Sequence, residues 1–244
     1  MIRAAIFLAI FLLSSSPVLS SEIIVATASN ALKVVRELAR TYQELEGTEV
    51  RIVSGSTGKL YAQIVNGAPY DVFLSADKER PLLLEQRGIG IKGTRFTYAR
   101  GVLVVWTRDG ITLHSIEDLT DPRIRLVAIA NPDTAPYGRA AIEVLKNRGL
   151  LDKLRGKLLY GENVSQALGF ALTGNADASI VALSTVHGVE GRLMKIDPSL
   201  HSPIEQDAIA LKDSPQALKF LKFLRSPRAR SLFEKYGYIV PSSF

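Results

Sequence analysis

Four short segments of the sequence combine hydroxyls, amides and glycines in a way that could bind an anion. Each one comes directly before a stretch with helical periodicity: 28–30, 55–58, 131–138 and 161–165. The first turn of a helix has unpaired N–H groups and a partial positive charge, so several helix starts aimed at one point form an anion site. Hydroxyls add neutral donors, and Gly58 and Gly138 let the backbone approach closely. Taken singly, each segment is explained more simply as helix capping.

The elements that must position these segments alternate between strands and helices. Apolar runs predict strands at 22–27, 49–54, 71–75, 101–106, 125–130, 157–160, 178–183 and 206–211. Spacings of three and four residues predict helices at 30–46, 58–66, 78–87, 115–119, 137–148, 164–173, 215–224 and 227–236. Repeated β-α-β units predict an α/β protein with two lobes, each a mainly parallel sheet flanked by helices. Ligands of such sheets lie beyond the carboxyl ends of the strands, where the four segments fall, so we expect a ligand cleft between the lobes.

Composition excludes several classes of protein. The chain has 244 residues, of which 47% are apolar and 22% charged, as in ordinary globular proteins. It has no cysteine and three histidines, so a thiolate or histidine-rich metal site is not expected. The net charge of +6 comes from lysines and arginines spread over many helices. We expect no nucleic-acid partner, because no basic patch carries a reading element.

The N-terminus has the pattern of a secretory signal peptide, which we place at residues 1–20. Arg3 precedes ten apolar residues, Ala4–Leu13, a run too short to span a bilayer comfortably. Small residues and Pro17 follow up to Ser20. We therefore expect an exported protein, and the absence of cysteine argues against a lipid anchor.

Two catalytic interpretations compete with simple binding. Ser56 and Lys59 match the S-x-x-K pattern of serine acyltransferases, although the companion patterns S-D-N and K-T-G are absent. A secreted serine acyltransferase that uses Ser56 and Lys59 stays open as an alternative. A Ser-His-acid hydrolase is not expected, because none of His114, His187 and His201 follows a strand end that faces the four segments. We predict that the protein is not an enzyme, and we expect Lys59 to be solvated.

Motifs along nearly the whole chain after the signal peptide resemble the periplasmic molybdate-binding proteins of ABC transporters. They are Ala26–Asn30, Gly55–Ile64, Asn66–Asp77, Asn131–Gly138 and Tyr236–Tyr238, with the stretch from Gly55 to Asp77 the most specific. The resemblance implies a two-lobed type II periplasmic-binding fold with the ligand in the cleft between the lobes. Residues 21–98 and 207–244 would form lobe I, and residues 99–206 would form lobe II.

The resemblance also implies a set of ligand-binding residues. Ser29 and Thr57 would offer hydroxyls, Asn30 an amide, and Tyr137 and Val164 main-chain N–H groups, with Ser56 as a neighbour that could contribute. Many family members use a further Tyr hydroxyl in lobe II, where this chain has Ala182. Asn30 is the residue that could compensate for that missing hydroxyl.

These expectations define a solute receptor rather than a protein with a resident cofactor. Its ligand would be molybdate, and also tungstate, with another oxyanion such as sulfate as the alternative. An all-donor site disfavours a protonated anion, because the O–H would find no acceptor. The expected partner is an ABC permease in the inner membrane, and the expected state is a monomer in the periplasm.

Overall fold

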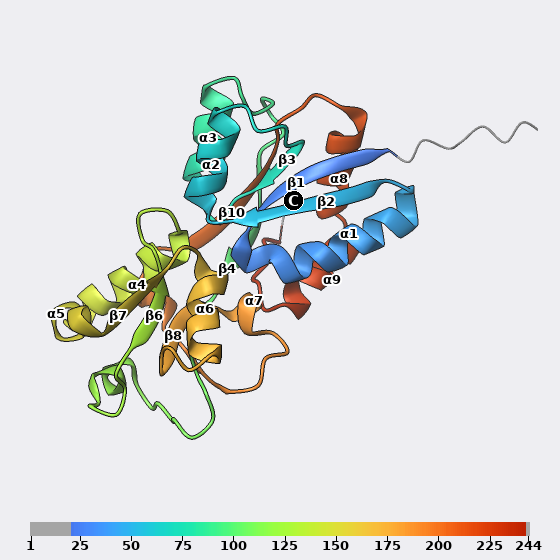
Figure 1. The fold of residues 1–244 in the computed structure, drawn as a ribbon. Coiled ribbons are helices and arrows are strands. Elements are labelled where there is room, and N and C mark those ends of the chain that lie inside the picture. The colour runs from blue at the N-terminus through green and yellow to red at the C-terminus, as the bar shows by residue number, and fades with distance from the viewer. Residues whose placement is uncertain (1–20, 243–244) are drawn as a thin grey trace, which may run out of the picture.

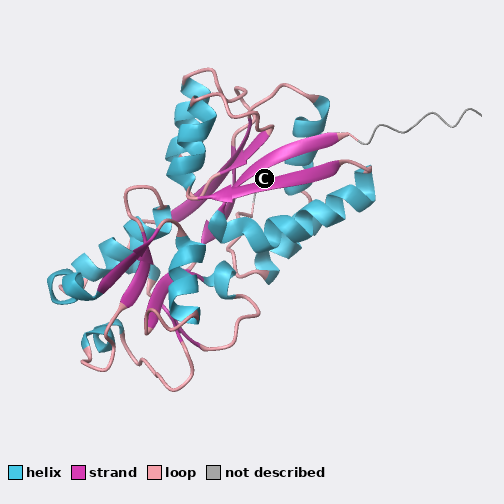
Figure 2. Cartoon of the chain, viewed as in Figure 1, coloured by secondary structure: helices cyan, strands magenta, loops and turns pink. Residues whose placement is uncertain are grey.

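The computed structural model describes residues 21–242, so the signal peptide predicted for residues 1–20 lies outside the described part. The described chain forms two lobes, each built on a five-stranded sheet with helices on its faces (Figures 1 and 2). Among these residues, no helix has the length and apolar character needed to cross a membrane.

The first sheet has the strand order β2-β1-β3-β10-β4. Its strands are β1 (Glu22–Ala28), β2 (Glu49–Gly55), β3 (Val72–Leu74), β4 (Phe96–Gly101) and β10 (Ile204–Ala210). Strand β1 runs parallel to β2 and β3, whereas β10 runs antiparallel to both of its neighbours. The sheet is therefore mixed, with one strand inserted against the direction of the others.

The second sheet repeats this topology in the order β7-β6-β8-β5-β9. Its strands are β5 (Leu103–Thr107), β6 (Val127–Ala130), β7 (Leu158–Gly161), β8 (Ala178–Ala182) and β9 (Arg192–Lys195). Strand β6 is parallel to β7 and β8, and β5 is antiparallel to β8 and β9. Strand β5 therefore has the place in this sheet that β10 has in the first.

The lobes are joined where the chain passes between the sheets. Strand β4 of the first sheet leads into β5 of the second through Val102 alone, and the chain returns in β10. The lobe boundaries expected from the sequence, at residues 98/99 and 206/207, fall inside β4 and β10. In Figure 1, β10 and β4 run from the upper lobe toward the lower one.

Helices cover both sheets. Lobe I carries α1 (Leu32–Glu46), α2 (Thr57–Val65), α3 (Glu79–Gln86), α8 (Pro215–Leu224) and α9 (Pro227–Lys235), and lobe II carries α4 (Pro136–Asn147), α5 (Leu151–Leu154), α6 (Val164–Leu172) and α7 (Leu183–Val186). Short 3₁₀ helices lie at Ser29–Ala31, Ile116–Thr120, Arg155–Lys157 and Pro198–Leu200. Helix α1 buries Val35, Leu38 and Tyr42 on one face and ends at Gly47, whose φ of 67° suits glycine.

The C-terminal segment belongs to lobe I. Phe220 of α8 and Phe233 of α9 lie in one buried cluster with Val25 of β1 and Leu38 of α1. Tyr42 contacts Phe220 edge-to-face, with ring centroids 5.1 Å apart. This packing, with the hydrogen bond from Asn30 to Tyr238, holds the segment up to Tyr238 against the 3₁₀ helix before α1.

Candidate ligand-binding site

The four segments singled out in the sequence meet in one pocket between the lobes. Its lining contains all five residues expected to bind a ligand: Ser29, Asn30, Thr57, Tyr137 and Val164. The rest of the lining is small or polar: Ala28, Gly55, Ser56, Ala76, Ala135, Pro136 and Asn163. The space open to the centre of a water-sized sphere is about 10 Å³, so the pocket is small in this closed form.

Lobe I contributes two hydroxyl groups. Thr57 opens α2 and is 1% exposed, and its Oγ1 accepts a hydrogen bond from the Ala76 N–H at 3.1 Å. Since that bond uses a lone pair, the Thr57 hydroxyl proton is left to donate into the pocket. Ser29 is 7% exposed, and its hydroxyl makes no hydrogen bond to any residue between 21 and 242. Both hydroxyls are thus available as neutral donors.

Lobe II contributes main-chain N–H groups at two helix starts. Pro136 is the first residue of α4, so the Tyr137 N–H lies in the first turn and has no acceptor within the helix. At the start of α6, the Asn163 side chain accepts from the N–H groups of Ser165 (3.0 Å) and Gln166 (3.1 Å). The cap thereby leaves the Val164 N–H for another acceptor.

The side chain of Asn30 has a different role from the one expected. Its Nδ2 donates to Gln206 Oε1 at 2.9 Å and to Tyr238 Oη at 2.8 Å, so both amide hydrogens are occupied. The side-chain amide therefore cannot replace the hydroxyl that is missing at Ala182. Its main-chain N–H, in the first turn of the 3₁₀ helix that precedes α1, remains as a donor.

The pocket is lined without a charged side chain. The nearby carboxylate of Asp77 is paired instead with Arg80 and with Arg139, whose Nη2 lies 2.9 Å from Asp77 Oδ2. Within residues 21–242 no group of three or more His, Cys, Asp or Glu side chains could hold a metal cation. Converging helix starts and free hydroxyls make the site electropositive without a formal charge, which suits an anion.

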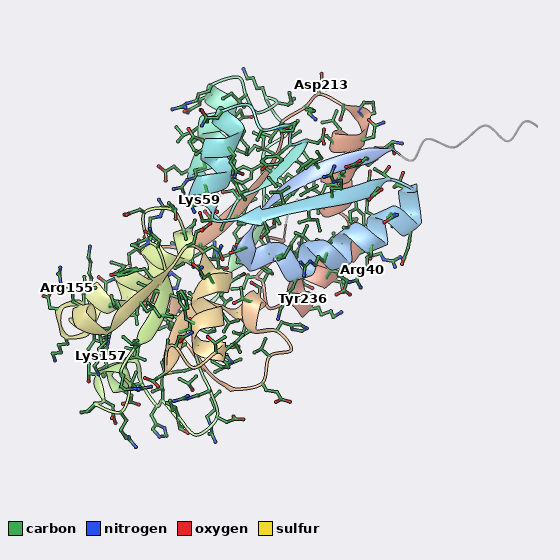
Figure 3. The ribbon with its side chains drawn as sticks, viewed as in Figure 1. Arg40, Lys59, Arg155, Lys157, Asp213 and Tyr236 are labelled. Carbon is green, nitrogen blue, oxygen red and sulfur yellow. The ribbon has the colours of Figure 1, made fainter. Side chains whose placement is uncertain are left out.

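Lys59 is solvated as expected, with 52% of its side chain exposed, and it also forms an ion pair. Its Nζ lies 2.9 Å from Glu162 Oε2, and this ion pair joins α2 of lobe I to the turn before α6 of lobe II. Figure 3 shows Lys59 at the boundary between the lobes. Ser56 is 2% exposed, and its hydroxyl accepts a hydrogen bond from the Lys59 main-chain N–H as a helix cap. The Lys59 amine is therefore directed to Glu162, and the geometry does not support a nucleophile–base pair at Ser56.

Several contacts hold the lobes together around the pocket. The Gly58 N–H donates to Thr134 O at 2.8 Å, and the Ser165 hydroxyl donates to Ser29 O at 3.2 Å. A Cβ on Gly58 would lie 3.1 Å from the Cα of Thr134, so glycine is what allows this approach. The structure is thus a closed form in which both lobes touch across the site.

A buried polar layer behind the pocket was not found from the sequence. Gln206, Tyr98 and Tyr238 make hydrogen bonds to Asn30 or to one another there. Tyr238 belongs to a motif that carried the family resemblance, but nothing in the local pattern of Tyr98 or Gln206 marks them. Their role follows only from the crossing of β4 and β10 behind the site.

The fold and the pocket define a two-lobed receptor for a small solute, with the periplasmic-binding-protein architecture and a site of neutral donors between the lobes. The chain belongs to the bacterial extracellular solute-binding protein family, whose model matches residues 23–239.

Several proteins similar to this chain are named molybdate-binding proteins. The molybdate-binding protein ModA of Rhodobacter capsulatus is 40% identical over 227 residues, which covers 91% of this chain and 90% of the relative. The protein of the same name from Azotobacter vinelandii is 39% identical over 228 residues, with 90% of each chain covered. The solved structure of the Azotobacter vinelandii periplasmic molybdate-binding protein matches with a TM-score of 0.86 and 36% identity, over 90% of this chain and 100% of that one.

Proposed function

We propose that this protein is a periplasmic receptor that binds molybdate and delivers it to an ABC permease. The observation that carries the proposal is the convergence of neutral donors from both lobes on one small pocket without a charged side chain. Relatives at 40% and 39% identity are named molybdate-binding proteins, and they match nearly the full chain.

The donor set suits a tetrahedral dianion that carries no proton. Hydroxyls of Ser29 and Thr57 and N–H groups of Asn30, Tyr137 and Val164 would each give a hydrogen bond to an ionised acceptor, which is the stronger kind. A buried dianion whose oxygens lacked partners would be costly, so the number of donors matters. Molybdate is fully deprotonated near neutral pH, whereas phosphate is partly protonated and its O–H would meet only donors.

Tungstate presents the same charge and the same tetrahedral arrangement of oxygens, and we propose that it binds as well. Sulfate is also an unprotonated dianion, but it is smaller, so its exclusion would depend on how far the lobes close. The contacts between Gly58 and Thr134 and between Ser165 and Ser29 limit that closure.

The protein would act by binding and release, without chemistry on the ligand and without a resident cofactor. Closure of the lobes would present a surface that the open form lacks, and a permease could thereby distinguish the closed form from the open form. The alternative of a serine acyltransferase is not favoured, because the Ser56 hydroxyl caps α2 and the Lys59 amine pairs with Glu162.

Isothermal titration calorimetry with molybdate, tungstate, sulfate and phosphate tests the proposal. We expect saturable binding of molybdate and tungstate at one site per chain and no heat with phosphate. Absence of molybdate binding at micromolar protein would refute the proposal. Covalent labelling of Ser56 by a fluorophosphonate would instead support the acyltransferase hypothesis.

A further inference from the structure

Behind the pocket lies a set of hydrogen-bonded residues from both lobes. Its members are between 0% and 4% exposed: Asn30, Tyr98, Tyr137, Ser184, Gln206 and Tyr238. They come from the 3₁₀ helix before α1, from β4, β10 and the C-terminal segment of lobe I, and from α4 and α7 of lobe II. We call this set the hinge network, because β4 and β10 are the strands through which the chain passes between the sheets.

Gln206 is the centre of the hinge network. Its Oε1 accepts from Asn30 Nδ2 at 2.9 Å and from the Tyr98 hydroxyl at 2.8 Å. Its Nε2 donates to the Tyr137 hydroxyl at 3.0 Å. One amide side chain thus contacts a residue of the pocket from lobe I and another from lobe II.

A second bond between the lobes ends on Asn30. The Ser184 hydroxyl of α7 donates to Asn30 O at 2.9 Å, and the Tyr238 hydroxyl donates to the same oxygen at 3.0 Å. That carbonyl forms a peptide unit with the Ala31 N–H. The Asn30 N–H shares its peptide unit with Ser29 O, which accepts from the Ser165 hydroxyl of lobe II at 3.2 Å. Hydrogen bonds to that oxygen polarise the peptide and orient the Asn30 N–H.

The space around the network is shaped for these side chains. A Cβ on Gly101 would lie 1.9 Å from the Tyr137 hydroxyl oxygen and 2.8 Å from Gln206 Nε2, so glycine on β4 makes room for the contact. Burial raises the pKa of the hydroxyls of Tyr98, Tyr137 and Tyr238. The network is therefore uncharged at neutral pH, and its fixed pattern of donors and acceptors persists over the physiological range.

We infer that Gln206 is a positioning residue that couples closure of the lobes to placement of the ligand-binding N–H groups of Asn30 and Tyr137. This inference rests on the proposed function. Lobe I holds Gln206, and lobe II holds Tyr137, so parting of the lobes breaks the bond between them. The bond forms only when α4 has brought the Tyr137 N–H to the pocket. The same side chain fixes Asn30 from the other side, so the donors of the two lobes reach their places together.

The test compares variants that delete this contact and keep the main-chain N–H groups that line the pocket. Gln206→Leu removes the central amide, and Tyr137→Phe removes only the hydroxyl while the main-chain N–H stays. Tyr42→Phe is the matched control, because the Tyr42 hydroxyl is also buried in lobe I but has no hydrogen-bond partner in the described residues. Molybdate affinity is measured by calorimetry, and thermal unfolding is measured without ligand.

Tyr137→Phe is expected to weaken molybdate binding by about 5- to 100-fold, because closure would then leave the Gln206 N–H group unpaired in a buried site. Its ligand-free melting temperature should stay near that of the wild type, since the contact exists only in the closed form. The double variant of Gln206→Leu and Tyr137→Phe should bind no worse than Gln206→Leu alone, because both remove the same bond. Tyr42→Phe should bind as the wild type does.

Unchanged affinity in Tyr137→Phe, or additive losses in the double variant, would overturn the inference. A fall in affinity that is matched by an equal loss of ligand-free stability would show a structural role instead and would also overturn it. Failure of the wild type to bind any oxyanion would refute the proposed function. That result differs from one in which the wild type binds molybdate and the variants bind it equally well, which would refute only the inference about Gln206. If Gln206→Leu does not fold, Tyr137→Phe still decides the question.

Discussion

Thr57 offers the sharpest test of the site, because its hydroxyl has two separable roles. Its Oγ1 accepts a hydrogen bond from the Ala76 N–H at 3.1 Å, and its proton is free for a ligand. The side chain is 1% exposed, so water cannot replace either partner easily. Thr57→Val keeps the shape of the side chain and removes both hydrogen bonds. Thr57→Ser keeps the hydroxyl and removes one methyl group.

The magnitudes follow from the two bonds. A hydrogen bond to a charged group contributes about 1.5–3 kcal/mol, so loss of the donor in Thr57→Val should weaken molybdate binding by about 10- to 150-fold. The buried Ala76 N–H also loses its partner, which costs about 1–3 kcal/mol of stability. This second loss occurs with or without ligand, so it lowers the melting temperature rather than adding to the change in affinity.

Calorimetric titration with molybdate and thermal unfolding without ligand measure the two effects separately. Thr57→Ser is the control and should bind within about threefold of the wild type, since both hydrogen bonds remain possible. A Thr57→Val variant that binds molybdate within threefold of the wild type would refute the assignment of this hydroxyl as a ligand. Equal losses in Thr57→Val and Thr57→Ser would show that packing, not the donor, matters at this position.

Three further predictions concern contacts outside the donor set. Lys59→Ala should weaken molybdate binding by at most about fivefold, because the exposed ion pair of Lys59 with Glu162 contributes up to ~1 kcal/mol to closure of the lobes. At high salt the difference in affinity between the variant and the wild type should disappear, because the ion pair is screened. Gly58→Ala should weaken molybdate binding about tenfold, because the new Cβ would lie 3.1 Å from Thr134 and hinder closure of the lobes. The ligand-free melting temperature should not fall, since Ala favours a helix over Gly by up to ~1 kcal/mol. Unchanged affinity would contradict this prediction. For Asp177, burial opposes ionisation, but hydrogen bonds from two main-chain N–H groups just before β6 outweigh it and lower the pKa of the carboxyl below 3.8. Its contribution to the free energy of unfolding is then present above that pH and lost as the pH falls, so the stability gap between wild type and Asp177→Asn, measured by urea unfolding, should narrow below pH 3.8.

The central strands and long helices could be predicted from the sequence because their patterns are local and strong. The apolar runs at β1, β6 and β8 and the periodicity of α1 lie where they were expected. Strands β4 and β9 were missed, and they occupy the same edge position in the two sheets. Strand β9 (Arg192–Lys195) is largely exposed and paired on one side only, so its residues carry no continuous apolar signal.

The candidate site was predicted as a set of residues, and its internal connections were not. The four segments could be singled out because each lies at a helix start after a strand, and the family resemblance then implied Ser29, Thr57, Tyr137 and Val164 within them. The hydrogen bonds of the Asn30 side chain and the pairing of Lys59 with Glu162 could not be predicted, because the partners are distant in sequence. A side chain at a helix start can cap the helix, face a ligand or turn away, and the local sequence is the same in each case.

The sequence by itself determined where helices begin, which residues cap them and which main-chain N–H groups remain without an acceptor in the helix. Ser56 and Asn163 are caps because their side chains reach N–H groups two or three residues on. The tertiary structure alone decided that the amides and hydroxyls left over point to one place. It also decided that Gln206 stands between the lobes and that Gly58 touches Thr134. The physical reason is range: capping acts within one turn of helix, whereas convergence depends on two sheets, their crossing strands and the closing of one lobe on the other.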